Sequence, residues 1–145
     1  MTAAREAIMT ALFALVSAAG PFATASRRLQ LWTELSAGET PAIFMAEREE
    51  QYDRKGEGLP PVVTMNVDLY IYTKPGLESG VTPSSVLNPL LDAIDAALAP
   101  SRVTGRLTLG GIVTHCRIEG KVFKDPGDID GEGMAIIPIK ILATI

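Results

Sequence analysis

The sequence contains one cysteine and one histidine among its 145 residues. One cysteine excludes an intramolecular disulfide and fits a reducing compartment. One histidine excludes the common metal sites that are built from several histidines. Basic residues are not in excess either: the net charge is −4 and the pI about 5.0, which does not support a basic face that neutralises nucleic-acid phosphates. Outside the N-terminal segment, no apolar run approaches the ~20 residues of a membrane span.

The bulk composition is that of a globular protein, with 47% apolar and 21% charged residues. A chain of this length buries roughly two-thirds of the surface that it exposes when unfolded. We therefore expect one domain that spans residues 1–145.

The N-terminal segment, MTAAREAIMTALFALVSAAG, has two interpretations. An arginine, an apolar run and then small residues are typical of a secretory signal peptide. However, Glu6 cancels the charge of Arg5, and apolar residues recur with the spacing of one helix face. The pattern favours an amphipathic helix over residues 3–19, ended by Gly20 and Pro21, and a signal peptide is the alternative.

Alternation of apolar and polar residues marks the clearest strand, Val62–Thr73. The second helix should end near Ala99 and Pro100, and it begins either after Asn88 or after Thr82. The other expected elements are an extended stretch at 22–32, a turn near 33–38, a short strand at 41–47, and long strands at 112–123 and 134–145.

The order of these elements predicts an α+β fold: a mostly antiparallel β-sheet packed against two α-helices, with a long β–β loop over 48–61. The last strand, 134–145, is apolar on both of its faces. A strand of this kind is expected to be covered on both faces.

Acidic residues alternate with glycines in FKDPGDIDGEGM, residues 123–134, as they do in calcium loops. In an EF-hand loop that begins at Asp128, the twelfth position requires a bidentate glutamate but holds Ile139. The expected flanks are strands rather than helices. The segment therefore predicts a hairpin connection whose turn geometry comes from Gly127, Gly131 and Gly133. A loose cation site in the Asp125–Glu132 loop, and with it a small calcium-binding module, is the alternative.

The neighbouring His115 and Cys116 invite comparison with a nucleophile and its base. Adjacent side chains of a strand project to opposite faces, so the two cannot form a hydrogen bond with each other. Cys116 shares its face with apolar residues, which predicts a buried, unreactive thiol. We find no catalytic constellation in the sequence and expect no enzyme, no cofactor and no metal site.

Other features predict association with further proteins. Pro138 has no N–H for a ladder, so one side of its strand is expected to be a sheet edge. The charged segment Arg48–Pro61 is long for a connector and is expected to be mobile until a neighbour orders it. Arginine and tryptophan are enriched in interfaces. The candidate residues for a subunit or tube interface are Arg27, Arg28, Trp32, Arg48, Tyr52, Arg54, Pro138 and Lys140.

Three stretches carry a resemblance to a known family: SRRLQLWTEL followed by PAIF, then LGGIVTHCRIEGKV, then DPGDIDGEGMAIIPIKIL. They look like the tail-terminator proteins of long-tailed bacteriophages (minor tail protein U-like), and the similarity in element order runs from about Ala3 to the C-terminus. The shared motifs are structural rather than catalytic.

The resemblance implies an α+β fold and a hexameric ring without cofactor or reaction. Such a ring caps the tail tube, ends its polymerisation and presents a surface to the head–tail connector protein. Its partners would be copies of itself, the tail tube protein and the connector, with no membrane involved. It would lie at the tail–neck junction of the virion, after assembly in the host cytoplasm. A neck or tail-completion (head–tail joining) protein is the nearest alternative.

The net negative charge suits a ring through which DNA passes, because it limits adhesion of the phosphate backbone. We therefore expect DNA to cross the lumen without specific binding. A strongly positive channel in the assembled ring would contradict this hypothesis.

Overall fold

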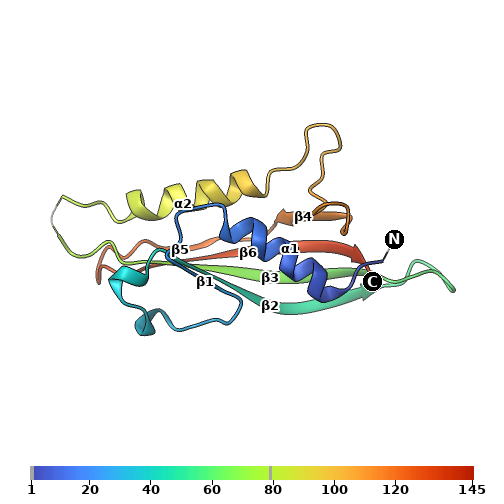
Figure 1. The fold of residues 1–145 in the computed structure, drawn as a ribbon, viewed down its shortest axis with the longest axis horizontal. Coiled ribbons are helices and arrows are strands. Elements are labelled where there is room, and N and C mark those ends of the chain that lie inside the picture. The colour runs from blue at the N-terminus through green and yellow to red at the C-terminus, as the bar shows by residue number, and fades with distance from the viewer. Residues whose placement is uncertain (1, 79) are drawn as a thin grey trace.

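The structure is a computed structural model that describes residues 2–78 and 80–145. It confirms the predicted α+β class: α1 and α2 lie on one side of a mostly antiparallel, six-stranded sheet (Figure 1). The elements are α1 (Arg5–Ser17), β1 (Thr24–Ser26), the short 3₁₀ helices η1 (Trp32–Glu34) and η2 (Ala37–Glu39), β2 (Ala42–Asp53), β3 (Val62–Thr73), α2 (Ser84–Ala97), β4 (His115–Ile118), β5 (Phe123–Asp125) and β6 (Gly133–Thr144).

The sheet has the strand order β1-β2-β3-β6-β4, and β5 also pairs with β6. β1 is parallel to β2, whereas the other pairs are antiparallel. β3 and β6 pair along their whole lengths, from Val62 opposite Thr144 to Thr73 opposite Gly133. These two strands form the centre of the sheet, and the bounds of β3 are those predicted from its alternation.

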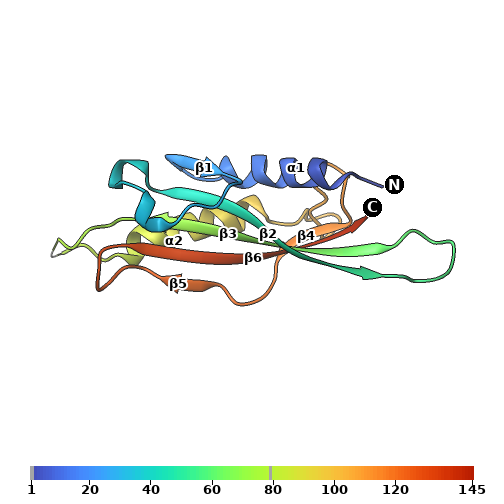
Figure 2. The same ribbon diagram turned by 90° about the horizontal axis from the view of Figure 1, so that it is seen from below.

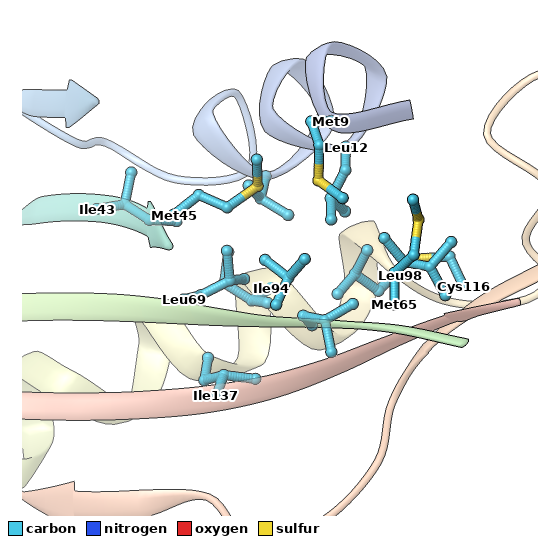
Figure 3. Close-up of a cluster of buried hydrophobic side chains, with 14 of the residues drawn as sticks. Met9, Leu12, Ile43, Met45, Met65, Leu69, Ile94, Leu98, Cys116 and Ile137 are labelled. Carbon is cyan, nitrogen blue, oxygen red and sulfur yellow. The ribbon is translucent and has the colours of Figure 1, made fainter. Parts of the chain in front are cut away.

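The main core lies between the two helices and the sheet face that they cover. In Figure 3, Met9 and Leu12 of α1 and Ile94 of α2 lie among sheet residues such as Leu69 and Met65. All five of these side chains are at most 2% exposed. The predicted N-terminal helix is therefore confirmed as an element that packs its apolar face on the sheet.

The prediction of a connector over 48–61 is wrong in its first half. β2 continues to Asp53 and pairs with β3 beyond a bulge between Glu47 and Glu50, so only residues 54–61 join the two strands. Every residue from Glu47 to Asp53 is exposed, so no alternation reveals the strand. Figure 2 shows this connection extending past the rest of the sheet.

The prediction that Pro138 marks a sheet edge is also wrong. β6 is an inner strand, with β3 on one side and β4 and β5 on the other. The Pro138 carbonyl accepts from the Glu119 N–H at 3.1 Å, so the missing N–H of Pro138 points to that same side. On that side, the expected strand 112–123 is interrupted between β4 and β5. No strand residue therefore requires an N–H donor from position 138, and proline is tolerated there.

The second helix begins at Ser84 with Pro83 as its N-cap, and Pro89 lies inside it. The alternative start after Asn88 is therefore wrong, and the start near Thr82 is the closer one. Proline in the sixth position leaves the Ser85 carbonyl without its helical donor. Both Ser85 and Pro89 are exposed, so water can satisfy that carbonyl.

Candidate interaction surface

The face of the sheet opposite the helices is covered only at one end. There Leu35 and Trp32 pack with Phe44 and Tyr72 in a second, smaller core. Along β6 the residues alternate between buried and half-buried, so the prediction that both faces of this strand are covered is wrong within the protomer. We call the remaining surface the open face; it includes Arg48, Thr64, Asn66, Asp68, Tyr70, Arg117, Glu119, Phe123, Ile136, Pro138, Lys140 and Leu142.

An apolar row crosses the open face from strand to strand. The register places Tyr70 of β3 opposite Phe44 of β2 and opposite Ile136 of β6, and Ile136 opposite Phe123 of β5. Phe44 is buried, Tyr70 and Ile136 are half-buried, and Phe123 is 49% exposed. The solvated face of an antiparallel sheet usually carries polar residues. The part of the row formed by Tyr70, Ile136 and Phe123 is thus apolar surface that the protomer leaves uncovered.

Arg48, at the bulge of β2, borders this row on the open face. Its Nε donates to Asp68 Oδ2 at 3.0 Å, and its Nη2 donates to the Tyr70 hydroxyl. The guanidinium carbon lies 5.3 Å from the centre of the Tyr70 ring. The hydrogen bond to Asp68 raises the pKa of Arg48 above its ordinary value. Because both partners are partly exposed, the ion pair contributes only ~0–1 kcal/mol to stability, and its main effect is to position the cation.

Glu119 forms ion pairs with two further cationic side chains, one from β4 and one from β6. It accepts from Arg117 Nε at 2.9 Å and from Lys140 Nζ at 2.8 Å. The Lys140 ammonium, and then the Arg117 guanidinium, hold the pKa of Glu119 below its usual range. A groove of about 430 Å³ separates this cluster from Arg48 and passes over Pro138. An apolar row with an ion-paired border has the composition of a protein interface, with an apolar centre and a polar rim.

The structure brings together three of the predicted interface residues on the open face: Arg48, Pro138 and Lys140. Trp32 lies at the covered end of the same face, where it packs against the smaller core. Their shared position was not visible in the sequence, because it depends on the register of β2, β3 and β6.

The other predicted interface residues lie elsewhere. Arg27 pairs with Glu6 of α1 at 2.5 Å and with Glu47 at 3.3 Å. The Tyr52 hydroxyl accepts a hydrogen bond from Arg5 of α1, which belongs to the helix side of the sheet. Arg28 and Arg54 are exposed and lie outside the strands of the sheet. The eight predicted residues therefore do not form one surface.

Sequence reasoning did not select Asp68, Tyr70, Ile136 or Phe123 as surface candidates. The alternation within 62–73 does place Asp68 and Tyr70 on the polar face of their strand, which was the available signal. The alternation expected over 112–123 likewise places Phe123 on the polar face of its strand, with Arg117 and Glu119, so a phenylalanine on that face was the available signal there.

The geometry around Cys116 confirms the prediction of a buried thiol. Cys116 is 0% exposed on the helix-covered face, and burial raises its pKa to about 12. His115 lies opposite Leu142 on the other face, and its Nδ1 accepts from the Leu107 N–H at 3.2 Å. The two side chains are on opposite sides of the sheet and cannot act as a nucleophile and base.

The acidic loop forms the predicted hairpin connection between β5 and β6. Asp125 Oδ1 accepts from the Gly127 N–H at 3.2 Å, and Asp130 Oδ1 accepts from the Glu132 N–H at 3.0 Å. Two of its carboxylates thus stabilise turns. Within residues 2–78 and 80–145, no three or more His, Cys, Asp or Glu side chains gather as a metal site.

Gly127 and Gly131 have positive φ angles of 96° and 72°, as predicted for the turn. Gly133 lies in β6 instead, where a Cβ atom would stand 2.3 Å from Thr73 Oγ1. Gly133 is therefore required for close packing rather than for turn geometry.

None of the helices in the described part of the chain has the length and apolar character needed to cross a membrane.

No protein-family model matches the chain, and no curated protein matches its sequence. Among solved structures, one chain of a structure described as "Virion of native gene transfer agent (GTA) particle" resembles the fold with a TM-score of 0.48 and 11% sequence identity. The likeness covers 92% of this chain and 84% of that chain. Nothing about what this chain binds follows from a likeness of that degree.

Proposed function

We propose that this chain is a structural subunit of a phage tail that forms a ring at the end of the tail tube. The observation that carries the proposal is the apolar row of Tyr70, Ile136 and Phe123, which lies uncovered on a sheet face with an ion-paired border. Such a surface becomes buried when the subunit binds another protein. The resemblance of the sequence to tail-terminator proteins, together with the α+β fold that this resemblance implies, supports the role at a tail.

The proposed ring consists of copies of this chain, six by analogy with the tail-terminator family. A ring repeats one heterologous contact until the rotation closes, so each subunit needs two different adhesive patches. The open face is proposed to form part of one of these patches. The ring ends tube polymerisation, offers its other side to the head connector, and makes or breaks no covalent bond.

The connection between β2 and β3 is proposed as a contact to the tube or to a neighbouring subunit. It extends past the rest of the sheet (Figure 2), and it exposes an apolar residue, Leu59, to 54%. Tyr52, at the base of the same hairpin, is also 54% exposed. A projecting hairpin of this kind can reach a second protein without disturbing the core.

The proposal is tested by mixing the purified protein with assembling tail tubes and imaging them by negative stain, with native mass spectrometry of the protein alone and with tubes. We expect a ring at one end of each tube and tubes that stop growing. Tubes that grow unchanged, with no protein at their ends, would contradict the proposal. A protein that binds only the isolated connector would instead be a neck or tail-completion protein.

A further inference from the structure

A groove of about 420 Å³ lies between α2 and the β4–β5 edge of the sheet. Its floor is apolar and includes Leu91 of α2, Ile118 of β4 and Val122, which is 39% exposed. Its rim carries two exposed carboxylates from α2, Asp92 and Asp95. The groove thus combines an apolar floor with an acidic border.

The basic residue that also lines the groove, Lys124, is not paired with these carboxylates. Lys124 Nζ donates to Asn88 Oδ1 at 2.6 Å, which fixes its ammonium group at one end of the groove. No salt bridge among the described residues includes Asp92 or Asp95. The rim therefore keeps its negative charge available for a cationic partner.

The complementary feature is the loop that follows α2, residues 101–107, which stands away from the sheet in Figure 1. Val103, at 94% exposure, lies between the exposed Arg102 and Arg106. The sequence holds no acidic residue between Asp95 and Glu119, and within the described ranges neither arginine forms a salt bridge. The loop is therefore an apolar tip with a charge of opposite sign to the groove.

Hydrogen bonds hold this loop in one shape. The Ser101 N–H donates to the Arg106 carbonyl at 3.0 Å, and the Gly105 N–H donates to the Ser101 carbonyl at 2.8 Å. The Val103 N–H donates to Ser101 Oγ at 3.2 Å, and Gly105 supplies a φ of 71° that other residues rarely adopt. A loop that is already ordered loses little conformational entropy when a partner binds it.

We propose that the Val103 tip of one subunit enters the α2 groove of a second copy, with Arg102 and Arg106 facing Asp92 and Asp95. The tip does not occupy the groove of its own chain, because Val103 is almost fully exposed. The two patches differ, so the contact is heterologous and continues from copy to copy until a ring closes. The inference rests on the proposed function, since it names a contact within the proposed ring.

Disulfide trapping tests whether the two sites meet. A Val103→Cys chain and a differently tagged Val122→Cys chain are mixed and mildly oxidised. The native Cys116 is buried and contributes little background. We expect a disulfide-linked heterodimer in several-fold excess over that from Val103→Cys mixed with Ile129→Cys, a matched control that is also 94% exposed. Equal yields from the two mixtures, or no heterodimer in either, would overturn the inference.

A charge exchange tests the ionic part of the contact. One variant carries D92R and D95R, and the other carries R102D and R106D. Each alone should assemble roughly tenfold or more weakly than the natural chain, because like charges then face each other. The mixture should regain assembly as an alternating ring, since both of its contacts again join opposite charges, and this rescue also shows that both variants fold.

The outcomes separate the inference from the proposed function. If each variant alone forms rings as the natural chain does, or if the mixture is not rescued, the tip-in-groove contact is wrong while the ring stands. If the natural chain forms no ring, alone or on tubes, the proposed function itself is wrong and the inference with it.

Discussion

The replacement of Phe123 by alanine should weaken self-association because it removes the most exposed member of the apolar row. A phenylalanine side chain buries about 200 Å² when fully covered. Since Phe123 is 49% exposed in the protomer, about 100 Å² remains for a partner to cover. At about 25 cal/mol per Å², this area is worth about 2.5 kcal/mol for each contact, or roughly a 60-fold change in the association constant.

Sedimentation of a dilution series measures this change in the concentration at half-assembly. The substitution also removes the buried half of the side chain, so it should lower the free energy of unfolding by about 2 kcal/mol, and circular dichroism must show that the variant is folded. Ile129→Ala is the matched control, because it removes an exposed apolar side chain outside the open face and should leave assembly unchanged. If Phe123→Ala assembles within twofold of the natural chain, the open face is not an interface.

Three further predictions concern the thiol, the β2–β3 connection and the acidic loop. Burial keeps the Cys116 thiol protonated in the folded chain up to a pKa of about 12, so stability falls as pH rises above the unfolded value of 9.0. Between pH 9 and 10.5, denaturant titrations should show a loss about 1.5 kcal/mol larger than in Cys116→Ala, and equal losses would refute this. The amides of residues 54–61 should exchange hydrogen quickly in the free subunit and slowly in the assembly; equally slow exchange in both would count against the contact. Calcium or a chelator should leave the melting temperature unchanged, whereas a calcium-dependent rise of several degrees would favour the binding module.

The sequence predicts the inner strand and the helices well because these elements bury one face. The alternation in Val62–Thr73 and the helical spacing before Gly20 both reflect contact with the same core. The second half of β2 escaped prediction because its residues are exposed on both faces and keep no period. Backbone hydrogen bonds to β3 hold that part of the strand in place. Because these bonds do not depend on side-chain polarity, the sequence pattern does not reveal them.

The break between β4 and β5 depends on two residues that are distant in the sequence. Gly120 has a φ of 122°, and a Cβ atom there would lie 3.2 Å from Pro138 Cγ. Each residue alone predicts an irregular strand. Only the register of the folded sheet places Gly120 beside Pro138. The irregularity that the sequence indicates is therefore an interruption within the sheet and not a sheet edge.

The open face was predictable only in part, because the register that brings its residues together is not visible in the sequence. Arg48, Pro138 and Lys140 stand out by residue type, but the polar partners Asp68 and Glu119 join them only across strands. The α2 groove and the Val103 tip were not predicted at all. The charge difference between the Asp92–Asp95 pair and the acid-free stretch that follows was the signal in the sequence that could have revealed them.

Tail length in particles assembled without this protein tests the central claim most directly. If the chain ends tube growth, its removal should give tails of irregular, excessive length that do not join heads, and the natural chain supplied in trans should restore one length. Uniform tails of normal length, joined to heads in the absence of this protein, would contradict the account.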